Sequence, residues 1–309
     1  MPESRANSAG EAPEQPQSRQ GGGSRARSGV VASGVERIQA AFAQAAAQKR
    51  AALLPYLMGG FPDQETSLGV ARAYVDAGAD LVELGIPYSD PIAEGPVIHA
   101  AATRALSSGA TFAGVLEMCA AVGDQVPVLI MCYANEALGA GAPRGAAVFA
   151  ADGARRFAET IAAAGAAGAI IPDLPFDHGA ALVSELEQRG LASIPLVAPT
   201  TAPERRKAIC AAASGFVYVV SLTGVTGERA ALPAELSALV KSVREEAQVP
   251  AAVGFGIGTP EQAATVGAVA DGVIIGSRLV REVGEAADRE DATERVAAFL
   301  RETRAALAR

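Results

Sequence analysis

The 309-residue sequence contains no tryptophan, only three cysteines and no continuous apolar run of the length that a membrane span requires. Without tryptophan, the core has to be built from aliphatic side chains and small packing contacts. The cysteines, Cys119, Cys132 and Cys210, are odd in number and lie in apolar segments. We therefore expect them to be reduced core residues of a cytoplasmic protein, and neither a disulfide framework nor a metal site.

Positive charge is also scarce, because 26 Lys and Arg residues stand against 34 Asp and Glu residues and leave a net charge of −8. This balance argues against a nucleic-acid partner and against an anionic membrane as a partner. An anionic substrate would then need a local positive site, such as a helix N-terminus or backbone N–H groups. Half of the residues are hydrophobic and 19% are charged, a composition that suits one large globular domain.

The first 33 residues differ in composition from the rest of the chain. They are rich in Ser, Gly, Pro, Gln and Arg and carry few large apolar side chains. Such a segment buries too little surface to offset the entropy of ordering, so we expect residues 1–33 to be a disordered tail. The tail lacks the apolar core of a secretory signal, and its glutamates, Glu3, Glu11 and Glu14, count against an organellar transit peptide.

Residues 34–309 alternate between short apolar runs and amphipathic stretches. Ser33 and Glu36 have the spacing of a capping box and predict that the first helix starts here. The expected strands are Ala52–Met58, Asp80–Gly85, Pro127–Tyr133, Ala169–Asp173, Ile194–Ala198, Phe216–Ser221, Pro250–Gly254 and Gly272–Gly276. The expected helices include Ser67–Ala77, Phe112–Val122, Ala154–Ala164, Gly179–Arg189, Pro203–Ala213, Leu232–Glu246, Pro260–Val266 and Asp291–Ala308. Eight such alternations favour an α/β fold of the closed (β/α)8 TIM-barrel type over an open doubly wound sheet.

One carboxylate, Glu83, lies inside the apolar run Leu81–Ile86, which is typical of a buried strand. A buried charge is unfavourable unless it is paired or functional. The strand leads into an acidic loop that carries Ser89, Asp90 and Glu94. Parallel α/β enzymes place their chemistry at this end of a strand, so Glu83 is a candidate catalytic residue. A Glu83 that is merely held by a nearby Arg or Lys is the alternative.

Two glycine-rich segments follow the last two expected strands, namely Gly254–Gln262 and Ile275–Val280. Barrel enzymes commonly bind a phosphate with the loops at these positions and the N-terminus of a short extra helix. Glycine allows close backbone approach, and free N–H groups then act as donors without a cationic side chain. Ser277 is typical of a first-turn residue that adds a hydroxyl. Ordinary turn chemistry is the alternative for both segments.

A third glycine-rich segment, Ser221–Pro233, follows the sixth expected strand and is long for a connection of this type. Its polar, flexible composition and its place beside the phosphate loops favour an active-site lid over a plain solvated loop.

Together these segments resemble the tryptophan synthase alpha subunit family over nearly all of residues 33–309. The segments that carry the resemblance are PYLMGGFPD (Pro55–Asp63), ELGIPYSDP (Glu83–Pro91), MCYAN (Met131–Asn135), IPDLP (Ile171–Pro175), YVVSLTGVTG (Tyr218–Gly227), GFGIGTPEQ (Gly254–Gln262) and IIGS (Ile275–Ser277). The resemblance implies cleavage of indole-3-glycerol phosphate to indole and glyceraldehyde 3-phosphate without a cofactor. It also implies a pyridoxal-phosphate beta subunit as partner, in a heterotetramer of two alpha and two beta subunits.

The resemblance also assigns roles to single residues. Glu83 matches the catalytic acid and base, Glu94 matches a second catalytic acid, and Tyr218 matches a tyrosine beside the catalytic glutamate. Further matches are the phosphate ligands Gly227, Gly256, Gly276 and Ser277, and the residues that line the substrate pocket or couple it to the partner, Tyr56, Tyr133, Asp173 and Thr226.

The sequence departs from the family pattern at four places. Glu94 replaces an aspartate, and its extra methylene moves the carboxylate by something over ~1 Å, a change that can alter a rate by about 10²-fold. Leu222 replaces a residue that is often basic, and His99, which we expect on a helix surface, replaces a glutamine. The stretch 139–152 is longer than usual. Two alternatives therefore stay open: a stand-alone lyase that releases free indole, and a catalytically weak subunit that mainly activates a beta partner.

Overall fold

The computed structural model describes residues 32–308 apart from 92–93, 140–150, 221–233 and 255, and these residues belong to one compact unit. The expected disordered tail lies outside the described residues up to residue 31. Ser33 is the N-cap of α1 (Gly34–Ala47), and the capping box with Glu36 is formed as the spacing predicted. Four more helices begin at a residue whose side chain accepts a backbone N–H bond, namely Asp63, Thr111, Thr259 and Asp288.

All the strand pairs are parallel, and the strands follow each other in the order β5-β4-β3-β2-β1-β9-β8-β7-β6. The strands are β1 (Ala52–Met58), β2 (Val82–Gly85), β3 (Val128–Met131), β4 (Gly168–Ile170), β5 (Ala192–Ser193), β6 (Leu196–Val197), β7 (Val217–Val220), β8 (Ala251–Gly254) and β9 (Gly272–Ile275). The eight-strand alternation predicted from the sequence is therefore confirmed, with one difference: the expected strand Ile194–Ala198 contains β6, and the short strand β5 precedes it.

The two short strands β5 and β6 close the sheet. β5 and β6 lie at the two ends of the strand order, yet only Ile194 and Pro195 separate them along the chain. The Ile194 N–H donates to Ala169 on the β4 side, and the Tyr218 N–H donates to the Pro195 carbonyl on the β7 side. Proline has no N–H for a ladder, which interrupts the regular pairing at this point. The fold is an α/β barrel of the TIM type.

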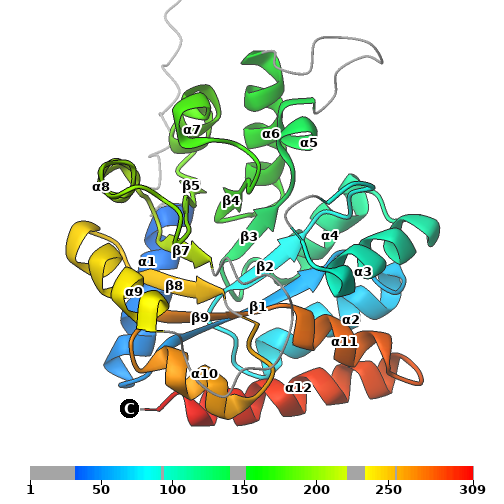
Figure 1. The fold of residues 1–309 in the computed structure, drawn as a ribbon. Coiled ribbons are helices and arrows are strands. Elements are labelled where there is room, and N and C mark those ends of the chain that lie inside the picture. Colours follow the sequence, from blue (N-terminus) through cyan, green and yellow to red (C-terminus); the bar gives the residue numbers. More distant parts are fainter. Residues whose placement is uncertain (1–31, 92–93, 140–150, 221–233, 255, 309) are drawn as a thin grey trace, which may run out of the picture. The chain divides into compact units, whose positions relative to one another are not determined.

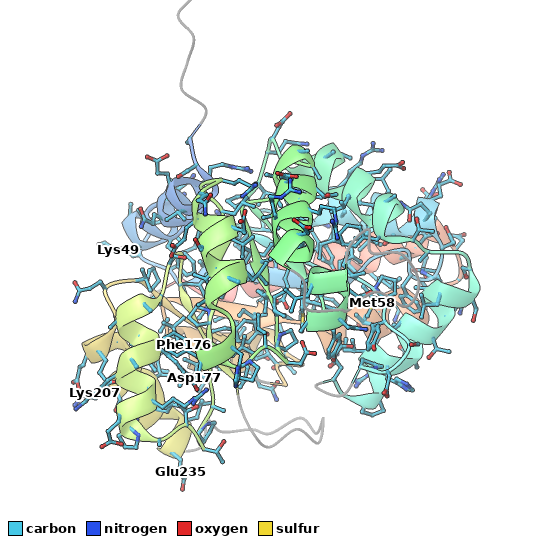
Figure 2. The ribbon with its side chains drawn as sticks, turned by 90° about the horizontal axis from the view of Figure 1, so that it is seen from above. Lys49, Met58, Phe176, Asp177, Lys207 and Glu235 are labelled. Carbon is cyan, nitrogen blue, oxygen red and sulfur yellow. The ribbon has the colours of Figure 1, made fainter. Side chains whose placement is uncertain are left out.

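Helices surround the strands (Figure 1). In chain order after α1 they are α2 (Gln64–Asp76), α3 (Pro96–Ser107), α4 (Phe112–Val122), α5 (Ala134–Gly139), α6 (Ala151–Ala163), the short 3-10 helix η1 (Phe176–His178), α7 (Ala180–Glu187), α8 (Pro203–Ala212), α9 (Ala234–Glu246), α10 (Pro260–Gly267), α11 (Ser277–Gly284) and α12 (Arg289–Ala306). Charged side chains such as Lys49, Lys207 and Glu235 are exposed, whereas Met58 at the end of β1 is buried (Figure 2).

Two apolar clusters form the core. The larger one lies between the strands and the surrounding helices, and it contains the three cysteines, which are buried free thiols as predicted. The smaller one fills the barrel with side chains from most of the strands, and Ile38, Phe42 and Ala45 of α1 pack into it. Phe42 contacts Phe216 with ring centroids 5.5 Å apart. One end of the barrel interior is thus filled by α1.

Among the described residues, no single helix is both long and apolar enough to cross a membrane. Helices α3 and α4 reach that length and composition only when taken together, and the chain bends by 106° between them.

Candidate active site

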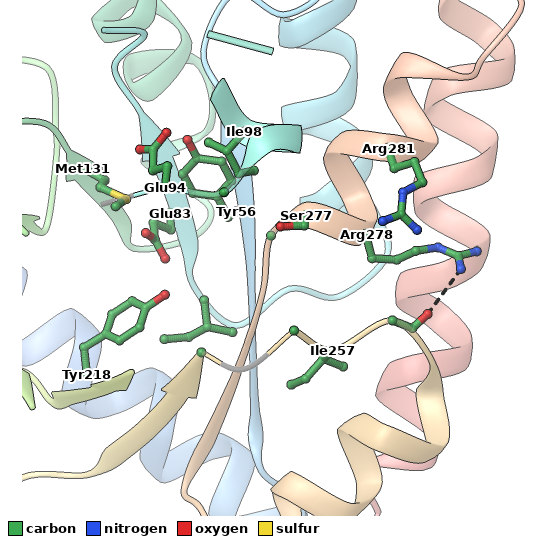
Figure 3. Close-up of a pocket in the computed structure, with 16 residues that line it drawn as sticks. Tyr56, Glu83, Glu94, Ile98, Met131, Tyr218, Ile257, Ser277, Arg278 and Arg281 are labelled. Atoms are coloured by element: carbon green, nitrogen blue, oxygen red, sulfur yellow. Dashed lines mark hydrogen bonds between the residues drawn. The ribbon is translucent and has the colours of Figure 1, made fainter. Parts of the chain in front are cut away.

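A pocket of about 250 Å³ lies at the carboxyl ends of the strands, where the loops after β2, β8 and β9 meet (Figure 3). Six strands supply residues to it or lead into the loops that do. Its lining residues are Tyr56, Glu83, Glu94, Gly95, Ile98, Met131, Tyr218, Gly254, Gly256, Ile257, Gly258, Ile274, Gly276, Ser277, Arg278 and Arg281. Seven of the residues that the sequence singled out therefore share one pocket.

Glu83 lies in the middle of β2, where it is paired in register with Tyr56 of β1 and Leu129 of β3. Its side chain is only 2% exposed. Burial, and then the negative charge of Glu94, raise the pKa of Glu83 from 4.5 to about 8. Within the described chain, no Lys or Arg forms an ion pair with Glu83. The alternative of a glutamate held by a basic neighbour is therefore wrong for the described residues.

Glu94 lies in the turn before α3, and its N–H donates to the Pro91 carbonyl over 3.3 Å. Burial raises the pKa of its carboxyl group to about 7. Its Oε2 atom is buried and has no hydrogen-bond partner among the described residues. The Glu83 and Glu94 carboxyl groups lie on the same side of the pocket (Figure 3). Because two nearby carboxylates disfavour each other's ionisation, this pair holds a proton at neutral pH.

Two tyrosines flank the carboxyl groups. The Tyr218 hydroxyl, on β7, is directed toward Glu83, and the Tyr56 ring lies beside Glu94 (Figure 3). Burial and the nearby carboxylates raise the pKa of both phenols well above 10, so both stay neutral donors. A Cβ atom at Gly254 would lie 2.6 Å from the Tyr218 hydroxyl oxygen, and one at Gly85 would overlap the Tyr56 hydroxyl. Glycine at these two strand ends therefore leaves room for the phenols.

The other end of the pocket is built from backbone. Gly276 is the N-cap of α11 and Ser277 is its first residue. The N–H groups of this first turn therefore have no hydrogen-bond acceptor within the helix. Gly256 lies in the loop after β8, and a Cβ atom there would meet nothing within 4 Å. The Gly258 N–H is occupied, because it donates to the Gln262 side chain over 2.7 Å. The geometry suits an anion at the helix N-terminus.

The remaining expected site residues have other places. Tyr133 is buried and its ring lies 5.0 Å from that of Tyr88, and the Asp173 carboxylate accepts the Ala134 N–H over 2.8 Å. Neither residue lines this pocket, so their role in it stays a prediction. Thr226, Gly227 and Leu222, together with the expected lid that contains them, lie outside the described residues.

Two further departures can be placed only in part. His99 is exposed on α3, which confirms the expected surface position. The long stretch 139–152 is described only at its two ends, which belong to α5 and α6.

The sequence did not single out several lining residues. Met131 ends β3, Ile98 lies in α3, and Arg278 and Arg281 lie in the first two turns of α11. The arginines had a readable signal, because they lie three residues apart, a helical spacing, in the segment SRLVR directly after Gly276. The prediction assigned the phosphate end to backbone N–H groups and the Ser277 hydroxyl, without a cationic side chain, and so passed over them.

Comparison with known proteins identifies the family. The family model described as tryptophan synthase alpha chain matches residues 42–308. The chain belongs to the tryptophan synthase alpha chain family. It is 45% identical over 264 residues to the alpha chain of Phenylobacterium zucineum (84% of this chain, 91% of that one) and 44% identical over 265 residues to that of Caulobacter vibrioides (84% and 92%).

Solved structures agree. The tryptophan synthase of Mycobacterium tuberculosis in space group F222 gives a TM-score of 0.79 at 35% identity, covering 90% of this chain and 100% of that one. The alpha subunit of Legionella pneumophila gives 0.76 at 35% identity, covering 88% and 98%. The resemblance predicted from the sequence is confirmed. Membership makes this chain a carbon–carbon lyase of tryptophan biosynthesis and implies a beta-subunit partner in a complex.

Proposed function

We propose that Glu83 is the acid and base with which this chain cleaves indole-3-glycerol phosphate to indole and glyceraldehyde 3-phosphate. The observation that carries the assignment is the position of Glu83. It is buried within β2, its pKa is raised to about 8, and it lines the same pocket as the N-terminus of α11. A carboxyl group that stays protonated near neutral pH can begin the reaction as an acid.

The reaction needs two proton transfers at one face of the substrate. Glu83 first donates its proton to carbon 3 of the indole ring, which leaves a positive charge on the ring nitrogen. The Glu83 carboxylate then removes the proton of the hydroxyl on the adjacent side-chain carbon. The bond between the ring and that carbon breaks, its electron pair returns to the ring, and the aldehyde forms. Glu83 ends protonated, as it began, and no cofactor takes part.

In this proposal, Glu94 stabilises the intermediate in which the indole ring is protonated. Its carboxylate accepts the indole N–H and stabilises the positive charge that develops on the ring. This role requires an ionised Glu94 beside a protonated Glu83, and the pKa values of about 7 and about 8 have that order. Two carboxyl groups whose surroundings separate their pKa values are a common basis for dividing acid and base roles. Tyr218, directed toward Glu83, orients it as a hydrogen-bond donor.

The phosphate binds at the opposite end of the pocket in this proposal. Gly256, Gly276 and Ser277 contribute N–H donors and a hydroxyl, and Thr226 and Gly227 stay proposed ligands from outside the described residues. Binding energy gained at this remote end holds the reacting carbon beside Glu83.

The finer partner assignment is also a proposal. We expect the chain to form a heterotetramer of two alpha and two beta subunits, and to work in the cytoplasm. The purified chain should be assayed for indole release from indole-3-glycerol phosphate, with and without a tryptophan synthase beta subunit. We expect release to rise strongly when the partner is added. Substantial turnover alone would instead indicate a stand-alone lyase, and activation of the beta subunit without indole release would indicate a catalytically weak subunit.

A further inference from the structure

Arg278 connects the two segments that form the phosphate end of the pocket. It is the second residue of α11, next to Ser277, and one of its terminal nitrogens donates to the Gly258 carbonyl over 3.3 Å (Figure 3). Gly258 belongs to the loop after β8, so this single bond joins that loop to the helix that follows β9.

The guanidinium of Arg278 is fixed from several sides. Its other terminal nitrogen forms an ion pair with Glu282 over 2.5 Å, and its central carbon lies 5.1 Å from the centre of the Phe299 ring. Glu282 is itself 9% exposed and also accepts from Arg295 over 2.7 Å. A planar guanidinium can satisfy a carbonyl and a carboxylate together and lie over an aromatic ring, which an ammonium group cannot do with the same geometry.

The order of charges in α11 is unfavourable for a helix without a ligand. A basic residue in the first turn opposes the helix dipole, and an arginine four residues before a glutamate is the weaker orientation of such a pair. α11 has no acidic residue in its first turn. The same order is favourable when an anion lies at the helix N-terminus, because Arg278 then adds positive charge to that end of the helix. The Arg278 Nε is, in addition, buried without a hydrogen-bond partner among the described residues.

We propose that Arg278 is a positioning residue that holds the loop after β8 and the N-terminus of α11 at the spacing that a phosphate monoester requires. This inference rests on the proposed function for the identity of the substrate. It adds a cationic side chain, fixed by Gly258, Glu282 and Phe299, to a site otherwise made of backbone donors and the Ser277 hydroxyl.

The test compares Arg278→Met with Arg278→Lys and with a matched control, Arg295→Met. Arg295 pairs with the same Glu282 but does not line the pocket. Binding of glycerol 3-phosphate is measured by calorimetry, and kcat and KM for indole release are measured with the beta subunit present. Arg278→Met should raise both the Kd and the KM by about tenfold, the size of effect that follows from losing one charge-assisted hydrogen bond. The kcat should stay within about threefold, because uniform binding is lost and the carboxyl groups lie at the other end.

The other two variants distinguish a positioning role of Arg278 from an effect of its charge alone and from a general effect on folding. Arg278→Lys keeps the charge and should recover less than half of the lost affinity, whereas Arg295→Met should leave the Kd within about twofold of wild type. Full recovery by lysine would overturn the positioning role in favour of charge alone. A wild-type Kd in Arg278→Met, or a fall in kcat as large as the rise in KM, would also overturn it. If wild type binds glycerol 3-phosphate but releases no indole, the proposed function fails while the binding comparison still tests Arg278.

Discussion

Replacing Glu83 with glutamine is the most direct perturbation of the proposed chemistry. The amide has nearly the shape of the protonated carboxyl group, so the buried position in β2 should accept it. It cannot donate and then recover a proton. We expect kcat for indole release to fall by about 10²–10⁴-fold, the range for loss of a general acid–base group. The affinity for glycerol 3-phosphate should stay within about twofold, because the N-terminus of α11 lies at the other end of the pocket.

The same variant should change stability in a pH-dependent way. The folded-state pKa of Glu83 is raised from 4.5 to about 8, so between these pH values the folded protein binds more protons than the unfolded chain. Stability of the wild type therefore falls as pH rises through this window, by at most roughly 5 kcal/mol. Glutamine does not ionise. The Tm of Glu83→Gln should therefore be close to that of the wild type near pH 4.5 and several degrees higher than that of the wild type at pH 9.

Both effects can be measured on one preparation. Indole release is followed with the beta subunit present, and Tm is measured by calorimetry at pH 5, 7 and 9. Glu136→Gln is a matched control, because Glu136 is a partly buried carboxyl group with a pKa raised to about 7 and lies outside the pocket lining. It should share the sign of the stability change and keep kcat within about threefold. If Glu83→Gln retained more than about a tenth of wild-type kcat, another group would carry the proton. A Tm difference that did not grow with pH would refute the buried, protonated state of Glu83.

Three further substitutions test other parts of the site. Gly276→Val should raise KM at least about tenfold, because the branched side chain blocks the approach of the backbone to the phosphate. The Tm should change little, because the new Cβ would lie 3.6 Å from Tyr56, an ordinary contact. An unchanged KM would remove Gly276 from the site. Glu94→Asp should be at least as active as wild type and Glu94→Ala should lose most of the rate. Wild-type rates in both variants would exclude a catalytic Glu94. Gly254→Ala should lower kcat by displacing Tyr218, whose hydroxyl oxygen would lie 2.6 Å from the new Cβ, and a crystal structure with Tyr218 unmoved would contradict this.

The fold was predictable because its signals are local. Apolar runs such as Ala52–Met58 match β1 to the residue, and the capping residues Ser33 and Thr259 mark helix starts in the sequence itself. The short strand β5 and its separation from β6 were not predicted, although Pro195 is visible in the sequence. A proline interrupts the pairing only where its missing N–H would have donated to a neighbouring strand. The identity of that neighbouring strand is set by the closed sheet and cannot be read from the local sequence.

The site was predictable where a residue's position follows from its strand. Glu83 and Tyr218 lie on β2 and β7, and parallel strands bring their carboxyl ends together, so their meeting follows from the topology. Arg278 and Arg281 depend on the start and rotation of α11, a helix of only eight residues. Sequence patterns fix such short elements poorly, because one residue of offset turns a side chain away from the pocket.

The two ends of the pocket should also be coupled through charge. A phosphate monoester dianion near Ser277 disfavours a second negative charge in the same pocket, so substrate binding should raise the pKa of Glu83 above its value of about 8 in the free protein. The ratio kcat/KM reports the free enzyme and kcat reports the complex, so the alkaline fall of kcat should lie at higher pH than that of kcat/KM. On the acid side, kcat/KM should fall as Glu94 becomes protonated below about pH 7. Rate profiles from pH 6 to 10, measured with the beta subunit, check both limbs. If the two alkaline limbs coincided, the phosphate would bind too far from Glu83 to influence it, and if both rates rose beyond pH 9, a protonated Glu83 could not be the acid that starts the reaction.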